Sequence, residues 1–360
     1  SIVFNNKAQS GGGIYARGDD SNTNKNAIMN IYNSIIHNNE ATDRGGGIYA
    51  YGDSNTNRNA IMDIYNSIIQ NNKAFQGSGG GIYMVNADAI IENTKIYDNV
   101  AYYYEGYDDG GGIYMAYTVA KIDNTKIDNN QAGEDGGGMY IANSDVTMTY
   151  TTFTANNASD DGGGMRIYAS DVTMTYTNFT ANKASDDGGG MDIVDSNVTI
   201  KNTTFTGNKA SDSGGGMAIY DSPVTLRQTS FINNDATNNG GGMAIYDSPV
   251  TLRQTSFIDN DATNNGDDIY AKKEPTISLI NTYFNNPNNI YEDTSYGGTP
   301  TWKTCETNNS PCDDGETCTN KTDGKSVKCL PTPTPVTPTC EINIEIRDNC
   351  TVQQQKQGLI

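Results

Sequence analysis

The sequence contains a single histidine, His37, among its 360 residues. Catalysis by a Ser-His-Asp triad or by any other imidazole would depend on this one side chain, so we do not expect it. Lysine and arginine are also scarce: 23 of them stand against 43 acidic residues, and the formal net charge is -20. Because no basic stripe is present to neutralise phosphates, nucleic acid is not an expected partner. No apolar run is long enough to cross a membrane, so we do not expect this chain to insert into one.

Cysteine is absent from most of the chain. The spacing of the cysteines is not that of a zinc site, and an even number in a short polar stretch predicts disulfides and an oxidising, extracellular or cell-surface location. Three bridges among six cysteines can be connected in fifteen ways, and the sequence does not select one. All six lie in the last sixth of the sequence: Cys305, Cys312, Cys318, Cys329, Cys340 and Cys350.

The rest of the chain is dominated by a repeat. Ten asparagines each lie three residues after a bulky apolar residue and two residues before an alanine, and from Asn130 onward they recur every 26 residues. A strict period in this range indicates one structural unit stacked on copies of itself. The ten are Asn6, Asn39, Asn72, Asn99, Asn130, Asn156, Asn182, Asn208, Asn234 and Asn260.

The unit at residues 214–239 shows what each copy contains. Apolar and polar residues alternate in three short runs, at 217–220, 224–227 and 228–231, and no segment has helical periodicity. These runs predict three short strands that close as one coil of a parallel β-helix, whose crossovers should be right-handed. We therefore predict an all-β fold, a single-stranded right-handed parallel β-helix of about ten coils with 26–34 residues in each coil.

Stacking of coils also accounts for the invariant small and polar residues. Identical amide side chains one strand spacing apart can hydrogen-bond along the axis, so we predict a structural ladder of asparagines inside the coil. We expect the alanines to lie where turns bring backbones close together, and the glycine triplets to form corners.

Only the first part of the chain repeats, so we predict four segments. The β-helix is expected over residues 1–292, followed by a Cys-rich module over 293–330. Residues 331–339 are expected to form an extended Pro/Thr linker, and residues 340–360 a C-terminal tail. The β-helix should thus be followed by a disulfide-rich and Pro-rich tail.

The repeat also has a family resemblance. Phe-x-x-Asn followed by Gly-Gly-x-Ile or Gly-Gly-x-Met is similar to the repeat of the polymorphic outer-membrane-protein family, within the pectate-lyase-like β-helix group, over residues 1 to about 290. This resemblance implies a right-handed β-helix displayed at a cell surface, commonly as an adhesin. The chain departs from the family's pattern at its Cys-rich and Pro-rich C-terminus.

Paired acids recur at the turn before the glycine triplet, at residues 108–109, 160–161 and 186–187. The resemblance implies that enzymes on this fold use carboxylates, with calcium and a basic residue in lyases. Because these pairs repeat at one turn, we expect solvated acidic turns rather than a catalytic site.

Oxygen-rich loops provide the one candidate cofactor site, for calcium. Two stretches place Asp or Asn at alternate positions, as in the first half of a calcium-binding loop. Both lack the later glycine and the bidentate glutamate, so they are weak candidates, and no other metal or cofactor is expected. The residues are Asp20, Asn22 and Asn24, and Asp53, Asn55 and Asn57.

Tyrosines follow the glycine corner in five successive coils. We expect them to point outward in one column, where they either strengthen the sheet or form a stripe that packs laterally or stacks on glycans. An insertion places three further tyrosines beside this column. The candidates are Tyr15, Tyr49, Tyr83, Tyr114 and Tyr140, with Tyr102, Tyr103 and Tyr104 in the insertion.

Seven sequons for N-glycosylation keep a secreted eukaryotic source open. Each sequon asparagine is a candidate for an exposed glycan. They are Asn157, Asn178, Asn197, Asn202, Asn308, Asn320 and Asn349.

Two functions remain open from the sequence. The preferred hypothesis is a non-catalytic, extracellular structural or adhesive rod, a subunit of a cell-surface fibre or appendage. Ser1 enters in mid-coil without a polar cap, so we expect other copies or subunits of a surface assembly to pair with the N-terminal coil, with glycans as further candidate partners. The alternative is a polysaccharide-binding or polysaccharide-cleaving β-helix, which requires a cleft where non-repeating acidic and basic residues converge.

Overall fold

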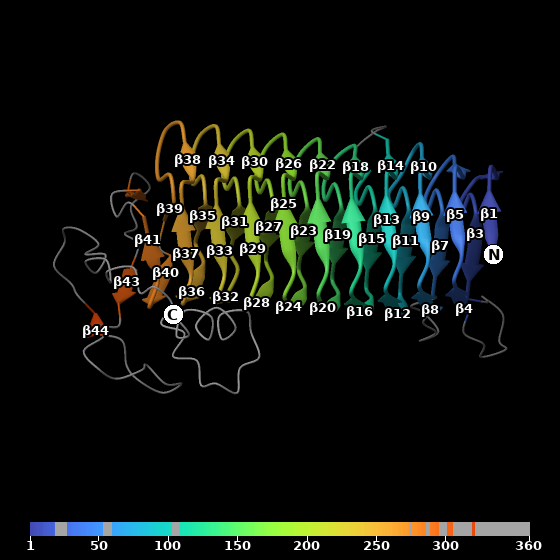
Figure 1. The fold of residues 1–360 in the computed structure, drawn as a ribbon, viewed down its shortest axis with the longest axis horizontal. Helices are drawn as coiled ribbons and strands as arrows, with labels where there is room; N and C mark the ends of the chain where they lie inside the picture. The colour runs from blue at the N-terminus through green and yellow to red at the C-terminus, as the bar shows by residue number, and fades with distance from the viewer. Residues whose placement is uncertain are drawn as a thin grey trace, which may run out of the picture. The chain divides into compact units, whose positions relative to one another are not determined.

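The chain divides into two compact units, residues 1–323 and 324–360, and all the described residues lie in the first. Among them, no helix has the length and apolar character that a bilayer crossing needs. The computed structural model (Figure 1) describes residues 1–18, 27–52, 60–102, 108–273, 275–285, 289–294, 301–304 and 319–320.

The first unit is a right-handed parallel β-helix, as predicted, but each coil has four strands rather than three (Figure 1). Each strand pairs with its equivalent one coil away, so the strands build four sheets that follow the axis. The additional strand contains only two residues, the second of which is the repeated alanine, as in the pairing of Ala132 with Ala158. Two residues are too few to show an alternating pattern, which is why the sequence did not indicate this strand.

The first two sheets contain the shortest strands. Sheet 1 consists of β1 (Ile2–Phe4), β5 (Ile35–His37), β9 (Ile68–Gln70), β13 (Lys95–Tyr97), β17 (Lys126–Asp128), β21 (Thr152–Thr154), β25 (Asn178–Thr180), β29 (Thr204–Thr206), β33 (Ser230–Ile232), β37 (Ser256–Ile258) and β41 (Tyr283–Phe284). Sheet 2 consists of β2 (Lys7–Ala8), β6 (Glu40–Ala41), β10 (Lys73–Ala74), β14 (Val100–Ala101), β18 (Gln131–Ala132), β22 (Asn157–Ala158), β26 (Lys183–Ala184), β30 (Lys209–Ala210), β34 (Asp235–Ala236) and β38 (Asp261–Ala262).

The other two sheets flank the corner that follows each glycine triplet and its strand. Sheet 3 consists of β3 (Ile14–Arg17), β7 (Ile48–Tyr51), β11 (Ile82–Val85), β15 (Ile113–Ala116), β19 (Met139–Ala142), β23 (Met165–Tyr168), β27 (Met191–Val194), β31 (Met217–Tyr220), β35 (Met243–Tyr246), β39 (Ile269–Lys272) and β42 (Ile290–Asp293). Sheet 4 consists of β4 (Ile28–Tyr32), β8 (Ala60–Tyr65), β12 (Ala87–Glu92), β16 (Val119–Asp123), β20 (Asp145–Thr149), β24 (Asp171–Thr175), β28 (Asn197–Lys201), β32 (Val224–Arg227), β36 (Pro249–Arg253), β40 (Thr276–Ile280), β43 (Thr301–Thr304) and β44 (Thr319–Asn320).

Sheet 4 continues past residue 292, where we placed the end of the β-helix. β43 pairs with β40 in parallel, and β44 then pairs with β43 in the antiparallel direction. The predicted boundaries at residues 330 and 339 lie outside the described residues and stay predictions.

Residues of the same kind stack in register along the axis. Ile141 lies opposite Ile167, and Met148 lies opposite Met174. The five phenylalanines of sheet 1 from Phe153 to Phe257 are fully buried, and neighbouring ring centroids lie 4.7–4.9 Å apart. The core is therefore a set of files of identical side chains, which fits the low apolar content of the chain.

The predicted asparagine ladder is confirmed by its hydrogen bonds. Asn182 Nδ2 donates to Asn208 Oδ1 at 2.9 Å and to the Phe153 carbonyl oxygen at 3.0 Å. Its Oδ1 accepts from the backbone nitrogen and from Nδ2 of Asn156, both at 3.0 Å. Asn39 to Asn260 are at most 4% exposed, so the ladder satisfies a file of polar groups inside the coil.

The corners of each coil use the left-handed region of the backbone. Asn143, Tyr150 and Ala155 have φ values of 48°, 48° and 53°. This conformation costs a non-glycine residue roughly 1–2 kcal/mol. Hydrogen bonds to the next coil offset this cost. For example, the Asn143 backbone nitrogen donates to the Tyr168 carbonyl oxygen at 3.0 Å. At Gly163 a Cβ atom would lie 2.3 Å from the Lys183 carbonyl, so this close approach requires glycine.

Replacing Asn182 with alanine should lower the free energy of unfolding by about 4 kcal/mol, because it leaves several buried polar groups of Asn156, Phe153 and Asn208 without partners at roughly 1–3 kcal/mol each. Urea unfolding followed by circular dichroism measures the change. The partly exposed Asn157, which pairs with Lys183 in the next coil, provides the control, and Asn157→Ala should change stability by less than about 0.5 kcal/mol. Equal losses in the two variants would contradict the role given to the ladder.

Candidate functional site

The tyrosine column, Tyr15, Tyr49, Tyr83, Tyr114 and Tyr140, runs along sheet 3. Its rings stack in order with neighbouring centroids 4.9–5.3 Å apart. Exposure varies along the predicted column, because Tyr83 is only 5% exposed, whereas Tyr15 is 52% exposed. The Arg44 guanidinium covers Tyr83, with its central carbon 5.5 Å from the ring centroid. The stacked rings support the role of strengthening the sheet, and the binding stripe stays a prediction.

Tyr102 lies apart from the tyrosine column. It follows β14 in sheet 2 and is 38% exposed. Its ring stacks on Phe75 at 5.2 Å, and Lys73 Nζ lies 5.9 Å from its centroid. Tyr103 and Tyr104 lie outside the described residues, so the predicted contact at this insertion stays a prediction.

The second acid of each pair before the glycine triplet belongs to one row, the aspartate file, which consists of Asp109, Asp135, Asp161 and Asp187. Asp109 is buried and the other three are half-buried. The Oδ1 atom of each accepts a hydrogen bond from the backbone nitrogen one coil further on, as from Asp161 to Asp135 at 3.1 Å and from Ser213 to Asp187 at 2.7 Å. The prediction of solvated turns is wrong for residues 108–109, because Asp108 and Asp109 are only 2% and 7% exposed, whereas the acids of the other two pairs are at least partly exposed. These carboxylates take the place of backbone acceptors at the corner.

Burial raises the pKa values of three carboxyl groups in this row, those of Asp109, Asp135 and Asp187. The pKa of Asp109 rises to about 8, through loss of hydration and the nearby charges of Asp135 and Glu134. Burial raises the pKa of Asp187 to about 7, against the hydrogen bond from Tyr220. Burial raises the pKa of Asp135 to about 6, and Arg166 opposes this shift. Asp109 and Asp187 are therefore only partly ionised near neutral pH.

Arg166 interrupts the tyrosine column and forms a charge cluster with Asp135, Asp161 and Asp192. It lies opposite Tyr140 in one neighbouring coil and opposite Asp192 in the other. Its Nη1 atom lies 2.8 Å from Asp135 Oδ1 and also contacts Asp161 Oδ2, while its Nε atom lies 3.3 Å from Asp192 Oδ2. Asp192 is 1% exposed, and burial raises its pKa while Arg166 opposes the shift. One guanidinium thus serves three carboxylates from three coils.

Two groups of acids bring carboxylate oxygens within 4.8 Å of one another: Asp135 with Asp160 and Asp161, and Asp186 with Asp187 and Asp212. Oxygen clusters of this kind could hold a cation such as calcium. Their central members already have partners, however. Arg166 contacts Asp135 and Asp161, and Asp187 accepts hydrogen bonds from Ser213 and Tyr220. These groups are therefore explained without a metal.

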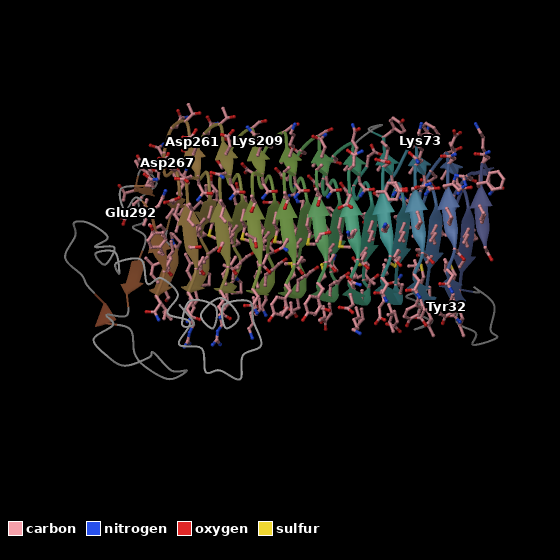
Figure 2. All side chains as sticks on the ribbon, in the orientation of Figure 1. Tyr32, Lys73, Lys209, Asp261, Asp267 and Glu292 are labelled. Carbon is pink, nitrogen blue, oxygen red and sulfur yellow. The ribbon has the colours of Figure 1, made fainter. Side chains whose placement is uncertain are left out.

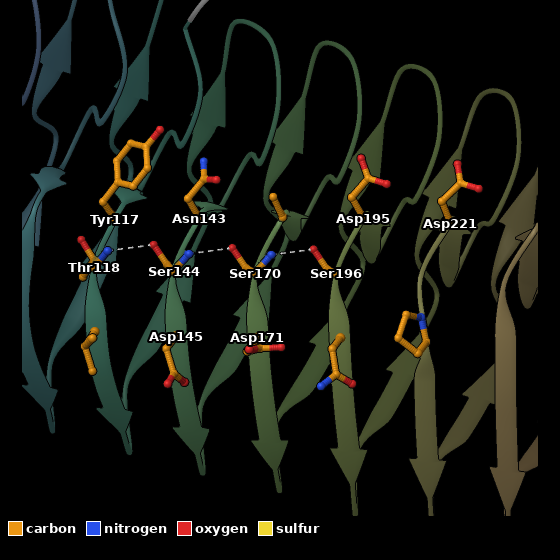
Figure 3. A pocket seen from close by; sticks show the side chains of 14 residues that line it. Tyr117, Thr118, Asn143, Ser144, Asp145, Ser170, Asp171, Asp195, Ser196 and Asp221 are labelled. Atoms are coloured by element: carbon orange, nitrogen blue, oxygen red, sulfur yellow. Dashed lines mark hydrogen bonds between the residues drawn. The ribbon is translucent and has the colours of Figure 1, made fainter.

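A groove follows the corner between sheets 3 and 4, and we call it the corner groove (Figure 3). Its volume is about 790 Å³. Its floor is a row of hydroxyl residues, Thr118, Ser144, Ser170 and Ser196, joined by backbone-to-hydroxyl hydrogen bonds of 3.0 Å. Figure 3 shows Asp145 and Asp171 on one side of this row and Asp195 and Asp221 on the other.

The coil geometry agrees with a comparison with known families. A family model described as a right handed beta helix region matches residues 1–231. The chain belongs to this right-handed β-helix family. A search of curated proteins gives no match. In this β-helix protein, the matched region contains both the charge cluster and the corner groove.

Many of the predicted site residues of this β-helix protein lie outside the described residues: all six calcium candidates, all six cysteines, Asn308 and Asn349. Among the sequon asparagines that the structure describes with a side chain, Asn197 is exposed, while Asn157, Asn178 and Asn202 are partly exposed. Asn320 lies in β44. Disulfides, glycosylation, calcium binding and pairing through the N-terminal coil stay predictions.

Sequence reasoning missed the charge cluster and the corner groove. The signal for the cluster is visible only when equivalent positions of successive coils are read as one column, in which five tyrosines are followed by Arg166 and Asp192. The signal for the groove is a second column that changes from Asn143 through Ala169 to Asp195, at residues with φ near 50°.

The raised pKa values predict that this β-helix is more stable in mild acid. A group whose pKa is higher in the folded state than in the unfolded state, where Asp has a pKa of about 3.9, stabilises the fold at low pH, and this contribution is lost as the pH rises through the folded value. The free energy of unfolding should therefore decrease as the pH rises from about 4 to about 8. Between pH 5 and 7, Asp109→Asn should make this decrease smaller by about 1.4 kcal/mol per pH unit. Chemical unfolding across this pH range measures the slope, and the exposed Asp261 provides the control as Asp261→Asn. An unchanged slope in Asp109→Asn would refute the assignment.

Removing the single cation of the charge cluster should strongly destabilise the coil. Arg166→Met leaves Asp135, Asp161 and Asp192 without their guanidinium, and breaking a buried ion pair costs roughly 3–5 kcal/mol. We expect a loss of about 3 kcal/mol at pH 7 and a smaller loss at pH 5, where the carboxylates take up protons. Thermal and urea unfolding measure both values. The control Arg227→Met, at an exposed arginine of β32, should leave stability nearly unchanged, and a similar loss there would contradict the cluster.

Proposed function

We propose that this chain is a non-catalytic structural and adhesive rod that is displayed outside the cell as a subunit of a surface fibre or appendage. The observation that carries the proposal is the asparagine ladder, which repeats the same buried contacts from Asn39 to Asn260. A contact set that repeats in every coil favours a role based on length and stiffness.

The stiffness follows from how each coil is attached to the next. Four backbone ladders, the asparagine ladder and the stacked rings of Phe153 to Phe257 all act between neighbouring coils. Strands in a sheet are about 4.8 Å apart, so ten coils extend roughly 48 Å along the axis. Bending this axis would stretch several of these contacts at once.

The outer surface is polar and repeats along the axis. In Figure 2, Lys73, Lys209 and Asp261 lie along one long edge of the coils, and Tyr32 lies on the opposite edge. Lys209 pairs with Asp235 in the next coil at 2.8 Å. The chain as a whole has a formal net charge of -20. A surface that repeats along the axis can form many weak contacts with a partner at the same time, which supports a role in adhesion.

The finer family assignment belongs to the same proposal. The Phe-x-x-Asn motif places a buried ring and a ladder amide in one turn, as at Phe153 and Asn156, and the glycines follow at the close backbone approach. These positions support a likeness to the polymorphic outer-membrane-protein repeats, whose members are displayed on cell surfaces. The alternative, polysaccharide cleavage, needs acidic and basic residues that converge in a cleft, whereas the residues that line the corner groove include no lysine or arginine. The basic residue of the charge cluster, Arg166, is already paired with Asp135 and Asp161.

Immunogold labelling of intact cells and electron microscopy of the native material test the proposal. We expect label on the outer surface of unpermeabilised cells and elongated particles or fibres that contain the full chain. Label that appears only after permeabilisation would contradict the location. Dispersed single molecules at every concentration, in microscopy and in sedimentation, would contradict the fibre subunit.

A further inference from the structure

The chain contains the dipeptide Asn-Gly twice, at Asn239-Gly240 and at Asn265-Gly266. Both copies end the same stretch of sequence, Asp-Ala-Thr-Asn-Asn-Gly, at residues 235–240 and 261–266. They occupy equivalent places in successive coils, because Asn239 and Asn265 pair with each other in parallel. A chemical difference between the two dipeptides must therefore come from the structure around them, and not from the sequence that they share.

Asparagine followed by glycine can lose its side-chain amide without an enzyme. The backbone nitrogen of the glycine attacks the asparagine Cγ atom, the bond between Cγ and Nδ2 breaks, and ammonia leaves with the proton of the glycine nitrogen. Water then opens the cyclic imide at either carbonyl and gives aspartate or isoaspartate. Glycine favours the reaction because it has no Cβ atom to obstruct the attack. A hydrogen bond that holds the glycine N–H to an acceptor opposes it.

The first copy is held on both sides by neighbouring coils. Gly240 is buried, and its backbone nitrogen donates to the Asn265 carbonyl oxygen at 3.0 Å. The Gly240 carbonyl oxygen accepts from the Gly215 nitrogen at 3.1 Å. Asn239 pairs with Ser213 in one neighbouring coil and with Asn265 in the other. Attack by the Gly240 nitrogen would first have to break the hydrogen bond to the next coil, so we expect Asn239 to react slowly.

The second copy lies where this stack ends. Among the described residues, sheet 2 ends at β38, which directly precedes the second Asn-Gly (Figure 1). Gly266 is half-buried, and no hydrogen bond joins its backbone nitrogen or oxygen to another described residue. Its φ of 67° is close to the 65° of Gly240, so the two turns bend alike and differ in their protection. The Gly266 nitrogen is therefore free to attack.

We propose that Asn265 is a site of spontaneous deamidation and is converted faster than Asn239. The Asn265 amide nitrogen donates to Asn239 Oδ1 at 3.0 Å. Deamidation replaces this donor with a carboxylate oxygen, so the contact between the two coils becomes repulsive. Isoaspartate also adds an atom to the main chain, which disturbs the pairing of the last coil with its neighbour. The modification would thus loosen one end of the stack as the protein ages, whether or not the rod belongs to a fibre.

Peptide mapping by mass spectrometry tests the proposal on the folded full chain, kept at mildly alkaline pH to promote the attack. Trypsin cleaves after Arg227, Arg253 and Lys272, so the two dipeptides fall in separate peptides, 228–253 and 254–272. We expect aspartate and isoaspartate to form at least about fivefold faster at Asn265, because the reaction at Asn239 must first break a net stabilising hydrogen bond. Equal rates at the two sites in the folded chain would overturn the proposal, as would faster loss at Asn239.

The unfolded chain provides the matched control, because both dipeptides then lack coil neighbours and should react at similar rates. If the folded chain keeps both amides while the unfolded chain loses them, the last coil protects as well as the interior, and the proposal fails. Hydrogen exchange checks the cause, since the Gly266 amide should exchange faster than the Gly240 amide. The variant Asn265→Gln should abolish the product in peptide 254–272 and leave the rate at Asn239 unchanged. Product that persists in this peptide would assign the reaction to another asparagine and overturn the site.

Discussion

The whole molecule depends on placing like residues one strand spacing apart. Each coil lacks the apolar content to be stable alone, so its polar groups must be satisfied by the coils on either side. The asparagine ladder does this in the interior, where each amide serves two neighbours and one carbonyl. A constant spacing between coils also explains three local features: the close packing of backbones, the need for glycine at Gly163 and the left-handed corners.

The same constraint explains where charge can be buried. The aspartate file exists because the corner leaves a backbone nitrogen that needs an acceptor, and a carboxylate from the previous coil supplies it. Once carboxylates are stacked, their repulsion must be relieved by protons or by a cation. Arg166 relieves it for Asp135, Asp161 and Asp192, and the hydroxyl of Tyr220 serves Asp187. The charge cluster is thus a local solution to a problem that stacking itself creates.

Much of the fold could be predicted from the sequence because the period identifies equivalent residues before any strand is assigned. The ladder from Asn39 to Asn260 follows directly from that alignment. The two-residue strand of sheet 2 could not be predicted, because a pair such as Lys183–Ala184 shows no alternation. The burial of Tyr83 could not be predicted either, since it depends on Arg44, which lies 39 residues earlier in the sequence and covers the ring. The corner groove could not be predicted, because its lining comes from both sides of the corner between sheets 3 and 4 in several coils, which a single repeat unit does not show.

The asparagine ladder also gives the molecule a direction. Within the ladder, each amide nitrogen donates to the side-chain oxygen of the coil that follows it in the chain, as from Asn182 to Asn208 and finally from Asn260 to Asp268 Oδ1 at 2.9 Å. A coil inserted in the opposite orientation would place its amide nitrogen next to another amide nitrogen, and its amide oxygen next to another amide oxygen. Gain or loss of a whole turn in the same sense leaves every amide matched. Such a molecule can therefore lengthen or shorten by complete units over evolutionary time, while reversal of any unit is forbidden.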